Sequence, residues 1–280
     1  MSGQESRGVG YAKNRAVEMS SGRFICFCDA DDYNAETRLQ DQFDVALELG
    51  SQNVFIGSCF IRDPPNSTER YTKWANSQTA CQLKTQIYTS HGPTVIAPTW
   101  FLTQELFDLV GKFNEVQSGY PEDLDFFYRA IDFGCVLFKV DKPLVTYRYH
   151  PQCASFGVSE HIIWKMRVDR FRRLILPKWS SFTIWNAGKQ GKLFFKSLRD
   201  EERLKITAFC DVDEKKIKHG SYEHYDEKER RVLCKIPIVH VRQATPPLVV
   251  CVKLDMSDGC LEELLATSGW LEDVDYVLFS

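Results

Sequence analysis

Residues 24–32 read Phe-Ile-Cys-Phe-Cys-Asp-Ala-Asp-Asp. The first five of these residues are apolar and predict a short buried strand, which delivers an acidic cluster at its carboxyl end. If the alternation of a strand continues through this segment, Asp29 and Asp31 face the same way while Ala30 packs. Two carboxylates placed in this way can hold a divalent cation against a diphosphate. An acidic turn or a helix start without a ligand is the other interpretation.

The composition is that of a soluble globular protein. The chain has 280 residues, of which 44% are hydrophobic and 26% charged, so one large domain or two ordinary domains are expected. A net charge of −3 argues against a global nucleic-acid or membrane surface, and any polyanion site must be local. The ten cysteines include no Cys-x-x-Cys pair, and no stretch suits a signal peptide or a membrane span. These features predict a reduced, cytosolic or nuclear protein without a membrane partner, and we take the cytoplasm as the expected location.

Strands and helices alternate through the first two thirds of the chain, which predicts an α/β sheet. The best-marked helix covers residues 35–49, with Asn34 as its cap, Gly50 as its stop and Leu39, Phe43, Ala46 and Leu47 on its buried side. The other expected helices cover residues 103–110 and 122–133, and the other expected strands cover residues 54–60, 135–140 and 144–149.

A second acidic pair, Glu122 and Asp123, follows Pro121 at the start of a predicted helix. Acids in the first turn of a helix are favoured by its dipole, which is one explanation of the pair. The functional interpretation is a general base that takes a proton from an acceptor hydroxyl at the edge of a cleft.

Five segments in order make the chain resemble a family 2 glycosyltransferase of GT-A fold. They are Gly8-Val-Gly-Tyr-Ala-Lys-Asn14, the segment from Ser21 to Asp32, Val110-Gly-Lys-Phe-Asn-Glu115, Glu122-Asp123 and Tyr147-Arg-Tyr-His150. Each is weak alone, and the order makes the resemblance specific. It implies an inverting transferase that uses a UDP-sugar and Mn²⁺ or Mg²⁺.

The resemblance also implies roles for residues on the donor side. Asp31 would ligate the metal, and Asp29 would lie at the metal and contact the ribose or sugar of the donor. Lys13 and Asn14 match a basic-Asn pair beside the donor, and Gly92 matches a glycine loop near the sugar.

On the acceptor side, the resemblance implies that Asp123 is the catalytic base, with Glu122 as its neighbour. His150 matches a histidine that approaches the metal or the diphosphate, although a lone histidine at a strand end is as often structural. The family usually begins with a strand, helix and strand that form the uridine pocket, and that portion does not precede Gly8 here. We therefore expect an incomplete GT-A domain with poor stability and weak or no activity by itself.

The pattern restarts near residue 178, so we expect a glycosyltransferase-like domain over residues 1–178 and a smaller Rossmann-like domain over residues 179–280. The latter has expected strands at 182–185, 206–213, 236–240, 248–254 and 274–279 and an expected helix at 192–198. Asn186 stands where a nucleotide-binding turn has its first glycine, and Asp211 stands where an acid would meet a ribose. A docking module without a ligand is the alternative.

The two domains together resemble the glycosyltransferases that attach galactose to queuosine in the anticodon of tRNA-Tyr, which implies a tRNA acceptor. A segment with interleaved aromatic residues carries the basic side chains that could meet RNA: Lys165, Arg167, Arg170, Arg172 and Arg173. An amphipathic helix whose aromatic residues pack inward explains the same pattern. Other functions left open are an N-acetylglucosaminyl transferase acting on a glycan or protein, and a non-catalytic binding protein.

Overall fold

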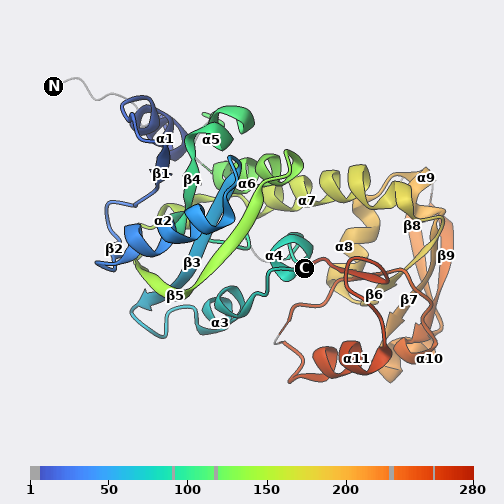
Figure 1. Ribbon diagram of the computed structural model, residues 1–280. Helices are drawn as coiled ribbons and strands as arrows, with labels where there is room; N and C mark the ends of the chain where they lie inside the picture. The colour runs from blue at the N-terminus through green and yellow to red at the C-terminus, as the bar shows by residue number, and fades with distance from the viewer. Residues whose placement is uncertain (1–6, 90–91, 117–118, 227–229, 255) are drawn as a thin grey trace. The chain divides into compact units, whose positions relative to one another are not determined.

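The computed structural model describes residues 7–89, 92–116, 119–226, 230–254 and 256–280. The chain divides into two α/β units, and the limit between them in the sequence lies between Trp164 and Lys165 (Figure 1). This confirms the predicted α/β class. Helix α7 (Glu160–Leu174) crosses the limit between the units, so most of it groups with the second unit, whereas the sequence assigned it to the first.

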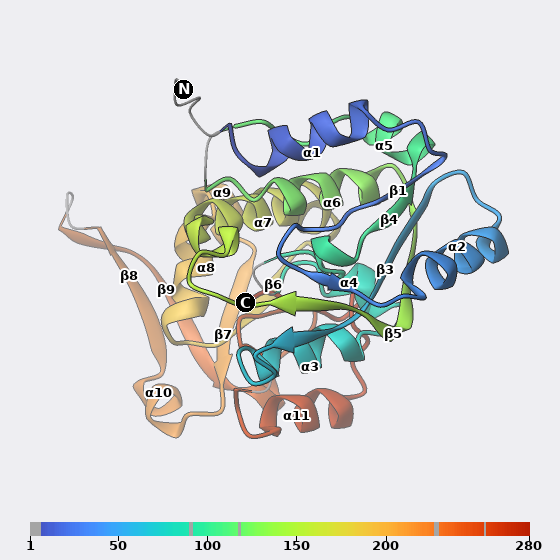
Figure 2. The same cartoon turned by 90° about the vertical axis from the view of Figure 1, so that its left-hand side faces the viewer.

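The first unit contains a mixed five-stranded sheet in the order β1-β4-β3-β5-β2 (Figure 2). Strands β3 and β5 are parallel, and the other neighbours are antiparallel. The strands are β1 (Phe24–Cys26), β2 (Tyr33–Asn34), β3 (Val54–Asp63), β4 (Phe101–Thr103) and β5 (Val136–Arg148). The helices are α1 (Val9–Glu18), α2 (Arg38–Leu49), α3 (Glu69–Ser77), α4 (Gln82–Thr85), α5 (Gln104–Val110) and α6 (Glu122–Asp132). Helices α1, α3 and α4 and strands β2 and β4 were not predicted.

Strand β5 is one long strand where the sequence predicted two. Its pairing with β3 shifts register on both sides of Cys59, which lies opposite Pro143. Proline has no backbone N–H, so it cannot donate to the ladder and is accommodated at such an irregularity. The proline therefore disturbs the register without ending the strand.

The buried face of helix α2 differs from the face that the sequence predicted. Leu39, Phe43 and Leu47 are exposed, whereas Arg38 and Gln42 are 2% and 0% exposed. The amide of Gln42 donates to the carbonyl of Thr99 at 2.8 Å, because the backbone beneath the helix presents carbonyls that need donors. The helix begins after Thr37 and not after Asn34 as predicted, whereas Ala46 is buried as predicted and Gly50 ends the helix in the left-handed conformation.

An aromatic cluster fills the core of the first unit. Trp100 is 0% exposed and lies 4.8 Å from Phe55, 6.2 Å from Phe113 and 5.9 Å from Phe126, measured between ring centroids. These rings come from a strand, a loop and helix α6. Their packing ties the start of α6 to the sheet, and it therefore holds the acidic residues of α6 beside the end of β1.

The second unit contains a six-stranded sheet in the order β11-β10-β6-β7-β9-β8. All neighbours are parallel except β8 and β9, which form an antiparallel pair that the sequence did not predict. Its strands are β6 (Phe182–Trp185), β7 (Ile206–Asp211), β8 (Ser221–Asp226), β9 (Arg231–His240), β10 (Leu248–Val250) and β11 (Tyr276–Leu278). Its further helices are α8 (Lys189–Ser197), α9 (Asp200–Arg203), α10 (Glu214–His219) and α11 (Cys260–Ser268).

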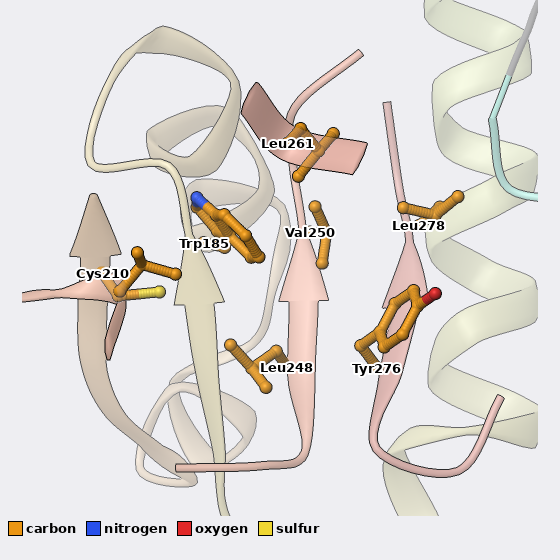
Figure 3. Packing of buried hydrophobic residues seen from close by; sticks show 8 residues of the cluster. Trp185, Cys210, Leu248, Val250, Leu261, Tyr276 and Leu278 are labelled. Carbon is orange, nitrogen blue, oxygen red and sulfur yellow. The ribbon is translucent and has the colours of Figure 1, made fainter. Parts of the chain in front are cut away.

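The strand order of the second unit reverses at β6. The chain first adds strands on one side, then returns to place β10 on the other side, which creates a topological switch point between β6 and β10. Figure 3 shows Trp185, Leu248 and Val250 packed across these central strands. Ligands of open parallel sheets bind outside the carboxyl ends of the strands at such a point.

Three-residue and four-residue 3₁₀ segments complete the described structure: Ala97–Thr99, Ala154–Gly157, Leu176–Lys178 and Val241–Gln243. Within the described parts of the chain, every helix is too short or too polar to cross a bilayer. All ten cysteines lie in these parts, and each is a free thiol.

Candidate active site

The acidic loop after β1 is not an extended strand. Strand β1 ends at Cys26, and Ala30, which was expected to pack, is exposed. The loop turns back on itself, since the N–H of Asp32 donates to the carbonyl of Asp29 at 3.2 Å. The two aspartates of the Asp-Ala-Asp segment are therefore separated by a turn, and each meets different partners.

Arg38 holds this loop from below, although the sequence gave no functional reason to single it out. Its guanidinium donates to the carbonyl of Phe27 at 2.8 Å and to the side chain of Gln42 at 3.0 Å, and it also contacts Asn34 Oδ1. A buried arginine with several acceptors constrains the segments that supply them. The signal available in the sequence was a charged residue near the start of a predicted helix.

Lys13 of helix α1 lies among three carboxylates. Its ammonium nitrogen is 3.2 Å from Oε1 of Glu122, and both side chains are largely buried. Burial lowers the pKa of Lys13, but the charges of Glu122, Asp29 and Asp123 outweigh it and leave the pKa above its usual value. One lysine and three acids thus converge from α1, the acidic loop and the start of α6.

Burial and the neighbouring Glu122 charge, opposed by Lys13, together raise the pKa of the Asp123 carboxyl to about 6. The N–H of Leu124 donates to Oδ1 of Asp123 at 2.7 Å and orients the group. A Cβ atom added at Gly92 would lie 3.9 Å from Oδ2 of Asp123, so the predicted glycine segment does lie beside the predicted base. A pKa of this size suits a base that works near neutral pH.

Asp29 has a raised pKa because burial outweighs the opposing charge of Lys13, and the charges of Asp31 and Glu122 add to the increase. Asp31 behaves differently, since its Oδ2 lies 2.8 Å from Nε2 of His150. This hydrogen bond keeps the pKa of Asp31 below its usual value, against a smaller effect of burial. The structure therefore brings Asp31 and His150 together.

Asp31 and His150 suit a cation that would also be bound by a substrate. They do not suit a metal centre whose ligands all come from the protein. In the described part of the chain, His, Cys, Asp and Glu side chains form no group of three or more that could hold a metal ion. Mg²⁺ usually takes one or two protein carboxylates and completes its shell with water and substrate phosphates. Asp31 and His150 could supply such a partial set, whereas Asp29 has Lys13 as its strongest charged partner.

Asn14 does not have the placement expected of a donor contact. It is 1% exposed, and its amide both donates to the carbonyl of Phe113 and accepts from the N–H of that residue, each at 2.9 Å. It also donates to Glu115 at 2.7 Å. These bonds use its donors and its oxygen within the protein, so Asn14 fastens helix α1 to the loop before α6 and thereby positions Lys13.

The predicted basic stripe for RNA is largely internal. Arg167 and Arg170 are 4% and 5% exposed, and Arg167 donates to the carbonyl of Ser280 at 2.8 Å. Arg172 forms an ion pair with Glu202 at 2.8 Å, which leaves Lys165 and Arg173 as the exposed members of the predicted set.

The aromatic residues of this segment also pack inward. Phe171 is 0% exposed and contacts the rings of Trp179, Phe182 and Phe194. Helix α7 therefore supplies part of the core of the second unit, which favours the amphipathic-helix interpretation over a row of RNA contacts.

Comparison with known families supports the class of the first unit. Residues 2–111 match the family described as "Glycosyl transferase family 2". The match covers less than half of the chain and supports a glycosyltransferase-like segment in the first unit. It contains Lys13, Asn14, Asp29, Asp31 and Gly92. Glu122, Asp123 and His150 lie beyond its limit.

Among solved structures, the chain is similar to S. aureus TarS 1-349, solved in complex with UDP-GlcNAc. The sequence identity is 17% and the TM-score is 0.46. The similarity covers 71% of this chain and 52% of that one, so it spans about half the length of TarS 1-349.

Proposed function

We propose that the first unit transfers a hexose from a UDP-sugar to a hydroxyl group with inversion at the sugar. The observation that carries this proposal is the convergence of Lys13 with Asp29, Glu122 and Asp123 at one place. These residues come from three segments that are far apart in the sequence. A matched glycosyltransferase segment that contains two of the four supports the same reaction class.

Asp123 is the proposed base. Its carboxylate would accept the proton of the acceptor hydroxyl as the hydroxyl oxygen attacks the anomeric carbon, and the bond to the diphosphate would break on the opposite side. Lys13 has two functions here: its ammonium pairs with Glu122, and its charge favours the ionised form of Asp123. Such a displacement needs no enzyme nucleophile.

Asp31 and His150 are the proposed contacts on the side of the leaving diphosphate. Mn²⁺ or Mg²⁺ bound there would neutralise the charge that develops on the diphosphate. The hydrogen bond between the two side chains holds Asp31 ionised, which is the form that binds a cation. Asp29 would accept a hydrogen bond from a hydroxyl of the donor ribose or sugar.

The finer assignment is galactose as the sugar and queuosine in the anticodon of tRNA-Tyr as the acceptor. It is supported by the sequence resemblance of the whole two-domain chain, and Lys165 is an exposed member of the predicted basic set. The other acceptor class is a glycan or protein that receives N-acetylglucosamine. A non-catalytic protein that retains a partner is the third candidate.

Calorimetric titration of UDP-galactose into the chain with Mn²⁺ tests the donor site, with UDP-N-acetylglucosamine as a parallel ligand. The variant Asp31→Ala should abolish micromolar binding. Asp213→Ala is the matched control, because Asp213 occupies the same place in the similar Phe-Cys-Asp-Val-Asp segment of the second unit. A folded chain that binds neither sugar nucleotide would contradict the proposed donor site.

The acceptor is tested separately by incubation with UDP-[¹⁴C]galactose and queuosine-containing tRNA-Tyr. Label in the tRNA that depends on queuosine would support the assignment. Matched tRNA that carries guanosine at the same position is the control. Equal labelling of both tRNAs, or donor binding without any label in tRNA, would contradict the assignment to queuosine.

A further inference from the structure

The turn between β6 and α8 in the second unit has the geometry of a nucleotide-binding turn. Asn186 has φ 119°, a conformation that glycine adopts most easily. A Cβ atom added at Gly191 would lie 1.8 Å from the carbonyl oxygen of Asn186, so only glycine allows the helix to approach this closely. The segment Asn-Ala-Gly-Lys-Gln-Gly over residues 186–191 thus retains two of the three glycines of the dinucleotide-binding pattern.

Two contacts occupy the place where a dinucleotide would bind. The amide nitrogen of Asn186 donates to the carbonyl of Cys251 at 2.8 Å, and the amide oxygen accepts from the N–H of Gly188 at 2.6 Å. Asn186 therefore connects the carboxyl ends of β6 and β10 across the switch point. A pyrophosphate would have to displace these bonds before it reached the turn.

Asp211, the residue expected to meet a ribose, has its acceptor sites filled. Oδ1 accepts from the N–H groups of Val212 and Asp213, and Oδ2 accepts from Ala187 and Lys216, all within 3.0 Å. A carboxylate has about four acceptor positions, so none remains for a ribose hydroxyl. Asp211 instead fastens the β6–α8 turn to the segment that follows β7.

A pocket of ≈ 490 Å³ opens beside this closed turn. We refer to it as the basic pocket. Its buried lining residues are Ala187 and Ile238, and its lining also includes Tyr222. The remaining lining residues are polar or charged: Lys192, Lys215, Lys216, His219, Ser221 and Glu223. A volume of this size lies in the range of small-ligand sites.

The charges around the basic pocket favour an anion. Lys216 is held by Asp211 at 2.8 Å, and its ammonium lies 3.5 Å from the position of a Cβ atom added at Gly188. The ammonium of Lys192 lies 5.3 Å from the centroid of the Tyr222 ring. Glu223, the acidic residue among the lining side chains, is paired with Lys235 at 3.0 Å. Lys192 and Lys215, from two helices, therefore line a pocket in which Lys216 and Glu223 are each already paired with a residue of opposite charge.

We propose that the basic pocket binds a nucleoside monophosphate, with the phosphate on Lys192 and Lys215 and the nucleoside on the apolar lining. A single phosphate is favoured because Asn186 fills the crevice in which a second phosphate of a dinucleotide would lie. A small ligand is favoured over RNA because the lysines line a concave site and not a continuous surface. This site lies wholly within the second unit and is independent of the donor site of the first.

Titration of AMP and of UMP into the full chain, followed by calorimetry, tests this inference. The variants are Lys192→Gln and Lys215→Gln, and the matched control is Lys218→Gln. Lys218 lies on the same helix as Lys215, is exposed, does not line the pocket and pairs with Glu214. Each pocket variant should weaken binding by about tenfold, as expected for a lost charge-assisted hydrogen bond. The control should bind like the wild type.

Three outcomes would overturn the proposal. Equal binding by the pocket variants and the control would exclude the basic pocket as the site. Inorganic phosphate that binds as tightly as both nucleotides would reduce it to a simple anion site. A six-nucleotide RNA that binds more tightly than either monophosphate, with the same loss in the variants, would indicate an RNA surface. The donor site of the first unit is tested separately, by UDP-galactose titration with the Asp31→Ala variant. A failure of UDP-galactose to bind would therefore contradict the proposed function and leave the result for the basic pocket unaffected.

Discussion

Two nearly identical pentapeptides have different surroundings in the two units. Phe-Cys-Asp-Ala-Asp covers residues 27–31, and Phe-Cys-Asp-Val-Asp covers residues 209–213. The first segment follows strand β1, and the second contains the end of strand β7. In the first, the strand ends at Cys26 and the aspartates lie in the turn that follows, with Asp29 near Lys13 and Asp31 bonded to His150. In the second, Asp211 is the last residue of β7, and Asp213 caps a helix.

The comparison shows that the Asp-x-Asp pattern specifies neither a ligand site nor a structural anchor. The surroundings decide which of the two it becomes. Asp211 is surrounded by four donors of its own unit, so its charge is satisfied within the protein. Asp29 is buried near other acids, and burial outweighs the charges of Lys13 and Arg38, so its ionised form is poorly stabilised within the protein.

The largest expected effect is on catalysis. Asp123→Asn keeps the shape of the side chain but removes the base, and the transfer rate should fall by about 10³-fold. Initial rates of sugar transfer measure this, and Asp108→Asn, a change at an exposed carboxylate of α5, is the control. A variant that retains a tenth of the activity would show that Asp123 is not the base.

The pH dependence of transfer provides the next test. The pKa of Asp123 is raised to about 6, so the carboxyl is protonated below that pH and cannot accept a proton. We expect kcat/KM to be constant at higher pH and to fall by about tenfold per pH unit below about 6. A rate that stays constant down to pH 5 would contradict this prediction.

Removal of one charge from each pentapeptide should change stability in different directions. Hydrogen bonds from Lys216, Asp213 and Ala187 outweigh burial and keep the pKa of Asp211 below its usual value. Asp211→Asn should therefore lower the free energy of unfolding at pH 7 by about 2 kcal/mol. Asp29→Asn should leave it unchanged or raise it, because burial raises the pKa of Asp29 and the ionised form is costly.

Urea denaturation of both variants at pH 7 and at about pH 3, below the usual pKa of an aspartate, measures these changes. A group with a lowered pKa contributes stability above its unfolded pKa and loses it as the pH falls through the folded value. The loss caused by Asp211→Asn should therefore shrink toward acid pH. If Asp29→Asn lowered the free energy of unfolding at pH 7 more than Asp211→Asn does, Asp29 and not Asp211 would be the stabilising aspartate.

The smallest expected effect concerns the second aspartate of each segment. Asp213 accepts from the N–H of Lys215 at 2.9 Å at the start of α10, so Asp213→Ala should cost about 1 kcal/mol of stability. Thermal unfolding of this variant and of Asp31→Ala, whose aspartate caps no helix, measures the difference. A drop for Asp31→Ala that equals or exceeds the drop for Asp213→Ala would show that Asp31 is also a structural residue.

The sequence could predict those elements whose signals are local. The helix that ends at Gly50 and the parallel strands of the second unit were correctly placed, because glycine stops and apolar runs act within a few residues. The buried face of α2 was wrong, because Arg38 and Gln42 serve carbonyls of segments that are distant in the sequence. A periodic pattern of leucines contains no information about such partners.

The sequence by itself determined the class of the fold, the order of its motifs and the acids available for chemistry. Tertiary structure alone decided which acids meet: Lys13 with Glu122, Asp31 with His150 and Asp211 with its own turn. It also decided that Asn14 and Arg167 are internal. The physical reason is that an ionisable group acts through neighbours within a few ångströms, and long-range packing chooses those neighbours.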